Sequence, residues 1–231
     1  MTRLFLIAAA SLGLLAAAAA DDTKPNDKTL GRKPPEKAEV LFDGKDLTGW
    51  VKPDGSTPAA WPVADGAMAV GKGKDGGNIL TKKRFGDFKL HLEFNVPLMP
   101  DAKGQARGNS GVYLDGLYEL QVLDSYGLDP KTNDCGAIYQ QIAPSVNACK
   151  PPLHWQTYDV TFHKARREGD KVVKKARVTV VQNGVTIIDD KEISVTPGGV
   201  GGLKEGDDGP ILLQDHGNDV RYRNIWIVPI N

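Results

Sequence analysis

The chain has 231 residues, with 29 Lys and Arg against 29 Asp and Glu, so its formal net charge is zero. A neutral chain offers no basic field to hold a phosphate backbone, which argues against a nucleic-acid partner. Two cysteines are too few for a disulfide-dense scaffold, and 26 glycines favour a turn-rich β architecture over a helix bundle.

Residues 1–20 have the pattern of an export signal. Arg3 precedes the apolar stretch 4–15, and an alanine run ends at Ala20, just before Asp21. The apolar stretch is short for a membrane span, and no cysteine follows that would carry a lipid anchor. We therefore expect cleavage near Ala20 and an exported mature protein, periplasmic or secreted, with no membrane partner.

Residues 21–38 form a leader rich in Lys, Pro and Asp. It contains almost no apolar side chains, so burial cannot offset the entropy lost when such a segment is ordered. We expect this leader to be disordered and a single domain to occupy residues 39–231.

The domain shows the two-residue periodicity of β-strands. Residues 87–96 alternate strictly between apolar and polar side chains, and residues 158–163 do the same. Two further runs flank Asn183-Gly184, a pair that tolerates positive φ and predicts a tight hairpin. Shorter strands are expected at residues 39–42, 111–114, 117–123, 137–142, 211–214 and 220–228.

Many short strands separated by Gly, Pro and Asp turns predict an all-β fold. We expect a two-sheet antiparallel jelly-roll sandwich. The segment 66–72 imitates a phosphate-binding loop, but Gly73 replaces the required Ser or Thr and no helix follows. No nucleotide cofactor is therefore expected.

Cys135 and Cys149 are 14 positions apart. In an exported chain we expect them to form a disulfide that closes a loop around residues 137–142.

Four segments together resemble the 3-keto-disaccharide hydrolase family, formerly a domain of unknown function. They are 41–50 (LFDGKDLTGW), 108–114 (GNSGVYL), 118–127 (YELQVLDSYG) and 209–217 (GPILLQDHG). The resemblance implies a concanavalin A-like jelly roll. It also implies a carbohydrate substrate, a glycoside already oxidised to a ketone at C3 by a separate sugar 3-oxidoreductase.

A C3 ketone changes the chemistry needed for glycoside cleavage. It acidifies the neighbouring C2–H, so one base can remove that proton and expel the C1 aglycone, after which water adds. The reaction needs a base near C2, a donor or cation at the developing enolate oxygen, and a proton source for the leaving oxygen.

The strand 117–123 supplies the first catalytic candidates. Glu119 and Gln121 share one face about 7 Å apart, whereas Asp124 would face the other side unless a β-bulge intervenes. Their spacing resembles the Glu-x-Asp-x-x-Glu pattern of jelly-roll endoglucanases. Because Gln121 replaces the central Asp, a retaining mechanism with carboxylates about 5–5.5 Å apart is disfavoured.

His216 is the leading candidate for the base, since an imidazole titrates near neutral pH and residues 214–217 follow an apolar strand at a turn. Glu119 is the alternative base. Together with His216 it is also a candidate ligand for a divalent metal ion acting as the enolate electrophile. The sequence does not separate the two as base.

The remaining candidates would bind substrate. Gln121 and Gln214 are expected to contact the sugar, and Arg221 to supply positive charge at the enolate. Asn109 and Ser110 either bind sugar hydroxyls or shape the turn that they occupy. Two other functions stay open at this point, a non-catalytic carbohydrate-binding module and an ordinary two-carboxylate glycosidase.

Overall fold

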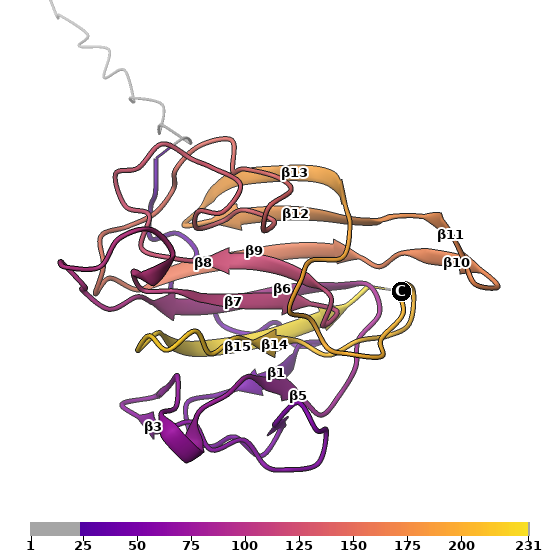
Figure 1. The fold of residues 1–231 in the computed structure, drawn as a ribbon, viewed down its shortest axis with the longest axis horizontal. Helices are drawn as coiled ribbons and strands as arrows, with labels where there is room; N and C mark the ends of the chain where they lie inside the picture. Colours follow the sequence, from indigo (N-terminus) through magenta and orange to yellow (C-terminus); the bar gives the residue numbers. More distant parts are fainter. Residues whose placement is uncertain (1–23, 231) are drawn as a thin grey trace, which may run out of the picture.

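The structure, a computed structural model, describes residues 24–230 (Figure 1). The predicted export signal and its cleavage site lie outside the described residues. Within residues 24–230, no helix is long and apolar enough to cross a membrane.

The described chain forms two packed antiparallel sheets, which confirms the predicted all-β sandwich (Figure 1). The larger sheet has eight strands, in the order β13 (Val185–Ile193), β12 (Ala176–Gln182), β9 (Gln156–His163), β6 (Phe88–Asn95), β15 (Arg221–Pro229), β4 (Ala67–Ala69) and β3 (Val63–Ala64), with β1 (Glu39–Phe42) also paired to β15.

The smaller sheet has five strands. Their order is β2 (Trp50–Val51), β5 (Ile79–Thr81), β14 (Leu212–Leu213), β7 (Ser110–Leu114) and β8 (Tyr118–Val122). A two-stranded ribbon, β10 (Arg166–Glu168) and β11 (Lys171–Lys174), extends beyond the sandwich, and two single-turn 3-10 helices are present, η1 (Gly73–Asp75) and η2 (Gly104–Ala106).

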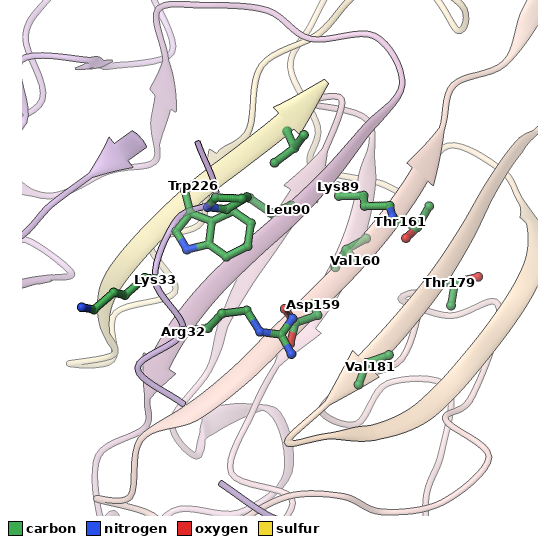
Figure 2. Close-up of a pocket in the computed structure, with 12 residues that line it drawn as sticks. Arg32, Lys33, Lys89, Leu90, Asp159, Val160, Thr161, Thr179, Val181 and Trp226 are labelled. Carbon is green, nitrogen blue, oxygen red and sulfur yellow. Dashed lines mark hydrogen bonds and ion pairs between the residues drawn. The ribbon is translucent and has the colours of Figure 1, made fainter. Parts of the chain in front are cut away.

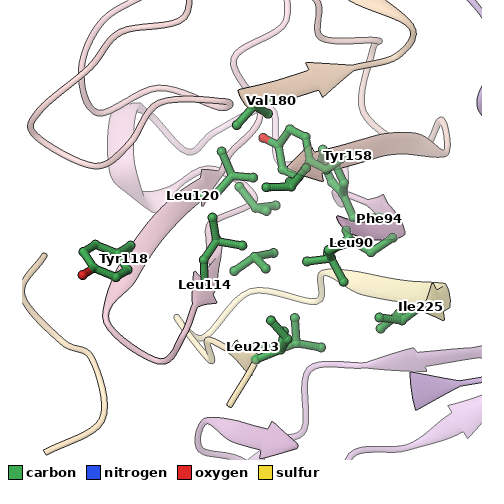
Figure 3. Close-up of a cluster of buried hydrophobic side chains, with 14 of the residues drawn as sticks. Leu90, Phe94, Leu114, Tyr118, Leu120, Tyr158, Val180, Leu213 and Ile225 are labelled. Carbon is green, nitrogen blue, oxygen red and sulfur yellow. The ribbon is translucent and has the colours of Figure 1, made fainter. Parts of the chain in front are cut away.

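The core lies between the sheets, where the inward side chains of both meet (Figure 3). Leu90 and Phe94 of β6 belong to the same buried cluster as Leu114 of β7 and Leu120 of β8, and all four are at most 2% exposed. Because side chains alternate along a strand, each inward residue leaves its neighbours on the outer face. The outer face of the smaller sheet therefore carries Glu119 and Gln121.

Several predicted strands are confirmed, and one is wrong. Asn183 and Gly184 both have positive φ, 49° and 79°, and join β12 to β13 as the predicted tight hairpin. The segment 137–142 forms no strand. It makes only isolated bridges, Leu120 to Ile138 and Ile138 to Ile142, and its backbone bonds to the edge of β8 through turns.

The leader differs from its prediction, since residues 24–38 lie ordered against the larger sheet. The backbone N–H of Gly31 donates to Glu93 at 2.6 Å, and Arg32 forms an ion pair with Asp159 at 2.8 Å. Thr29 is buried, with its hydroxyl against that of Thr157. Hydrogen bonds and ion pairs hold this polar segment in place of apolar burial, and composition alone does not reveal such partners.

The predicted disulfide is wrong. Cys135 and Cys149 are both free and buried. Their Sγ atoms lie 3.5 and 3.4 Å from the same Nε2 atom of Gln182, so the fold brings the two thiols to one side chain without joining them. Spacing in sequence says nothing of the Cβ geometry that a disulfide requires.

Candidate functional site

The candidate site lies on the outer face of the smaller sheet. The register of β7 and β8 pairs Tyr113 with Glu119 and Gly111 with Gln121, so all four occupy one face. The inward neighbours Tyr118 and Leu120 are fully buried in the core. The strict alternation of residues 118–122 thus delivers Glu119 to a face that the core does not use.

Glu119 is 4% exposed, and among residues 24–230 its carboxylate has one hydrogen-bond partner, the hydroxyl of Tyr113, which lies 3.0 Å from Oε2. The same hydroxyl lies 2.9 Å from the backbone oxygen of Pro197. The side-chain amide of Gln214 approaches it at 3.4 Å. Glu119, Tyr113 and Gln214 therefore form one polar cluster.

Gly111 makes room for this cluster. A β-carbon at this position would lie 2.7 Å from Oε1 of Glu119 and 3.3 Å from Oε1 of Gln214. The Oε1 atom of Gln214 is buried and has no hydrogen-bond partner in the described part of the chain. A buried acceptor without a partner costs free energy, and a donor brought by a bound molecule would satisfy it.

Burial raises the pKa of Glu119 to about 7, and the hydrogen bond from Tyr113 opposes this only in part. The Tyr113 hydroxyl has one proton and two acceptors within reach. When Glu119 is ionised, that proton is donated to the carboxylate; when Glu119 is protonated, it can turn to Pro197. The cluster accommodates both states of Glu119, as a group that accepts and returns a proton requires.

Gln121 and Asn109 both belong to a hydrogen-bond network around Gln105. Oε1 of Gln121 accepts from the N–H of Val122 at 3.0 Å, and its Nε2 donates to Gln105 at 2.9 Å. Asn109 donates from Nδ2 to the backbone oxygen of Gln105 at 2.7 Å. Gln105, on η2, links the two predicted residues, and no periodic pattern in the sequence points to it.

Asp124 does not join the Glu119 cluster. The pairing of β7 with β8 has no bulge that would turn it to that face. Its carboxylate lies 3.2 Å from Nε of Arg107, and Arg107 also donates to the backbone oxygen of Asp124. Asp124 therefore contacts Arg107 and not the Glu119 cluster, and its predicted catalytic role stays a prediction.

Ser110 and Arg221 lie away from the Glu119 face. The Ser110 hydroxyl points inward and lies 2.6 Å from both the backbone oxygen of Gln214 and the hydroxyl of Tyr222. Arg221 belongs to β15 of the larger sheet, opposite Asn95 of β6, and is exposed. The structure therefore does not bring either residue to Glu119, and their predicted substrate contacts stay predictions. Which sheet a strand joins depends on pairing information that the sequence alone lacks.

His216 is exposed in the turn after β14. Asp215 holds this turn by accepting the N–H groups of Gly77 and Gly217, each at 2.7 Å. Within residues 24–230 no hydrogen bond to the His216 ring is formed. In the same part of the chain no three His, Cys, Asp or Glu side chains lie together as a metal site of these ligands would require, so the structure adds no third ligand of these types to Glu119 and His216.

Tyr113 is the member of the Glu119 cluster that the sequence analysis did not single out. It stands two positions after Gly111 in the segment GNSGVYL, so alternation places both on the face of Glu119. Tyr139, half-buried, also belongs to the surroundings of Tyr113, since its N–H donates to the backbone oxygen of Glu119.

Comparison with known proteins shows the family of the chain. Residues 37–228 match the family described as the 3-keto-alpha-glucoside-1,2-lyase-like domain. The chain belongs to this family. A curated relative from Bacteroides thetaiotaomicron, named 3-keto-disaccharide hydrolase, is 26% identical over 81% of this chain and 77% of its own length.

Solved structures agree with the assignment to the 3-keto-alpha-glucoside-1,2-lyase-like family. A crystal structure from Parabacteroides distasonis, described as a candidate glycosyl hydrolase, is 38% identical, with 85% of each chain covered and a TM-score of 0.75. A second from the same organism, similarly described, is 20% identical with a TM-score of 0.61 and shows the shared fold. The resemblance seen in the four sequence segments is thereby confirmed.

Proposed function

We propose that the protein cleaves 3-keto-glycosides, 3-keto-disaccharides among them, by elimination and hydration. Removal of the C2 proton and loss of the C1–O bond release the aglycone and leave a C1=C2 double bond conjugated to the ketone. The departing aglycone oxygen takes up the proton removed from C2. Water then adds its hydroxyl to C1 and its proton to C2, so the net reaction is hydrolysis. The ketone comes from a separate sugar 3-oxidoreductase, and export would place the reaction in the periplasm or outside the cell.

The observation that carries this proposal is the environment of Glu119. A buried carboxylate with its pKa raised to about 7 is a stronger base than an exposed one and still ionises at neutral pH. His216, exposed and without a hydrogen bond in the described chain, lacks the positioning that a base requires. Between the two bases that the sequence left open, the geometry favours Glu119.

Two neighbours of Glu119 take the remaining roles in the proposed reaction. Tyr113 holds the carboxylate of Glu119 through its hydroxyl. Beside them, the buried Oε1 atom of Gln214 has no hydrogen-bond partner within residues 24–230. We assign Gln214 to a substrate hydroxyl or to the C3 oxygen, depending on which end of its amide faces the sugar. The proposed steps need no metal ion, and a divalent ion at Glu119 and His216 stays a prediction.

The test is incubation of the protein with a 3-keto-disaccharide and with the parent disaccharide, followed by mass spectrometry. We expect release of the aglycone from the keto sugar alone, and loss of about a thousandfold or more in kcat for Glu119→Gln. Glu168→Gln is the matched control, because Glu168 is exposed on the β10–β11 ribbon. Saturable binding without turnover would instead identify a carbohydrate-binding module.

A further inference from the structure

A groove of about 630 Å³ lies on the opposite side of the sandwich, on the outer face of the larger sheet (Figure 2). Its volume is in the range of ligand pockets, about 300–1,000 Å³. Leader residues Arg32, Lys33 and Pro35 form one wall, and strands β15, β6, β9 and β12 form the floor. It shares no residue with the Glu119 cluster.

Strand register aligns the floor in two rows that cross four strands. One row runs Val228, Lys89, Thr161, Thr179, and the adjacent row runs Trp226, His91, Asp159, Val181. With strands about 4.8 Å apart, each row is about 14 Å long. The floor is thus elongated and mixes hydroxyl, cationic and apolar side chains, which suits an extended ligand rather than a compact one.

The charge of the groove is strongly one-sided. Arg32, Lys33 and Lys89 line it, and Asp159 is its one carboxylate. Asp159 is already engaged by Arg32 at 2.8 Å and by His91 at 2.9 Å. Lys33 and Lys89 are exposed and form no ion pair within residues 24–230. The chain as a whole has 29 charges of each sign, so these two ammonium groups give the groove a local excess of positive charge. An anionic ligand would neutralise that excess.

The lining also restricts the chemistry of that ligand. Thr161 on β9 and Thr179 on β12 line the groove with hydroxyl groups. Its apolar surface comes from Val181, Val228 and Trp226. A ligand that carries carboxylates, hydroxyl groups and apolar C–H faces together meets all three. We propose that this groove binds an acidic oligosaccharide, a chain of sugars bearing carboxylates, and holds it away from the Glu119 face.

The test is calorimetric titration of the intact protein with a hexameric oligogalacturonate, with cellohexaose as a neutral chain of equal length. We expect the acidic chain to bind at least about tenfold more tightly, and its affinity to fall with added salt. The double variant Lys33→Gln/Lys89→Gln should weaken binding about five- to tenfold. Lys171→Gln/Lys174→Gln, which removes the same charge from the exposed ribbon, should leave it unchanged.

Three results would overturn the proposal: no binding of the oligogalacturonate, equal affinity in the Lys33/Lys89 variant, or equally tight binding of polyphosphate, which would indicate a general anion surface. Glu119→Gln should bind the acidic chain as the unmodified protein does. The groove and the proposed cleavage activity therefore succeed or fail independently.

Discussion

The hydroxyl of Tyr113 lies 3.0 Å from the carboxylate of Glu119 and 2.9 Å from the backbone oxygen of Pro197, with a single proton to share between them. That arrangement couples the direction of one hydroxyl to the protonation state of one buried acid. It also keeps Glu119 in place in both states, so the carboxylate need not be repositioned between accepting and returning a proton.

Tyr113→Phe should move the pH dependence of catalysis. In the unmodified protein the hydrogen bond from Tyr113 lowers the pKa of Glu119, which burial has raised to about 7. Without that hydrogen bond the pKa of Glu119 should be higher still. Because the base acts when ionised, the acidic limb of the kcat/KM profile should shift upward by about half to one pH unit. An unchanged limb together with reduced activity would assign Tyr113 a purely steric role.

Glu119→Gln should stabilise the fold in a pH-dependent way. Burial raises the folded-state pKa from 4.5 to about 7, so protonated Glu119 favours the folded state below pH 4.5, and that contribution is lost as the pH rises to 7. The variant should gain about 1–3 kcal/mol over the unmodified protein at pH 8 and little at pH 4.5. Denaturant unfolding at both pH values measures this, and an equal gain at the two would contradict the raised pKa.

Gly111→Ala should displace Glu119. The added methyl group would lie 2.7 Å from Oε1 and 3.2 Å from Cγ of that side chain, so the carboxylate must move. We expect a loss of kcat of about a hundredfold or more, with the fold retained by circular dichroism. Gly201→Ala is the control, because nothing lies within 4 Å of a β-carbon there. Full activity in Gly111→Ala would argue against the observed position of Glu119.

Thiol labelling should find two free cysteines per chain. Cys135 and Cys149 are unjoined and buried, so the folded protein should react slowly and the denatured, unreduced protein should react at both. Detection of no free thiol after denaturation would show that the two sulfurs at Gln182 are bonded in solution.

The sequence predicted the local geometry of the candidate site better than it predicted which residues make up that site. Alternation along residues 117–123 placed Glu119 on the outer face, and the Asn183-Gly184 turn located its hairpin, because both depend on neighbouring residues. The sequence did not show that Ser110 and Arg221 lie away from Glu119, because their surroundings depend on which strands pair at long range. Burial by distant loops, which raises the pKa of Glu119, has no local signature either.

The leader shows the same limit. Its composition predicts disorder, yet Gly31 and Arg32 find partners more than 60 positions away, in Glu93 and Asp159. A segment with almost no apolar residues can be ordered when the sheet beneath it carries buried polar groups that need partners.

In the proposed reaction, Glu119 removes the C2 proton of a 3-keto-glycoside. The most direct measurement is cleavage of a 3-keto-disaccharide in D₂O, with the 3-keto product examined at early times by mass spectrometry and NMR, against an enzyme-free control for spontaneous exchange. We predict one solvent deuterium at C2 of the product formed by the unmodified protein, and neither cleavage nor C2 exchange above background with Glu119→Gln. A product that keeps its original C2 hydrogen would contradict the removal of the C2 proton by Glu119.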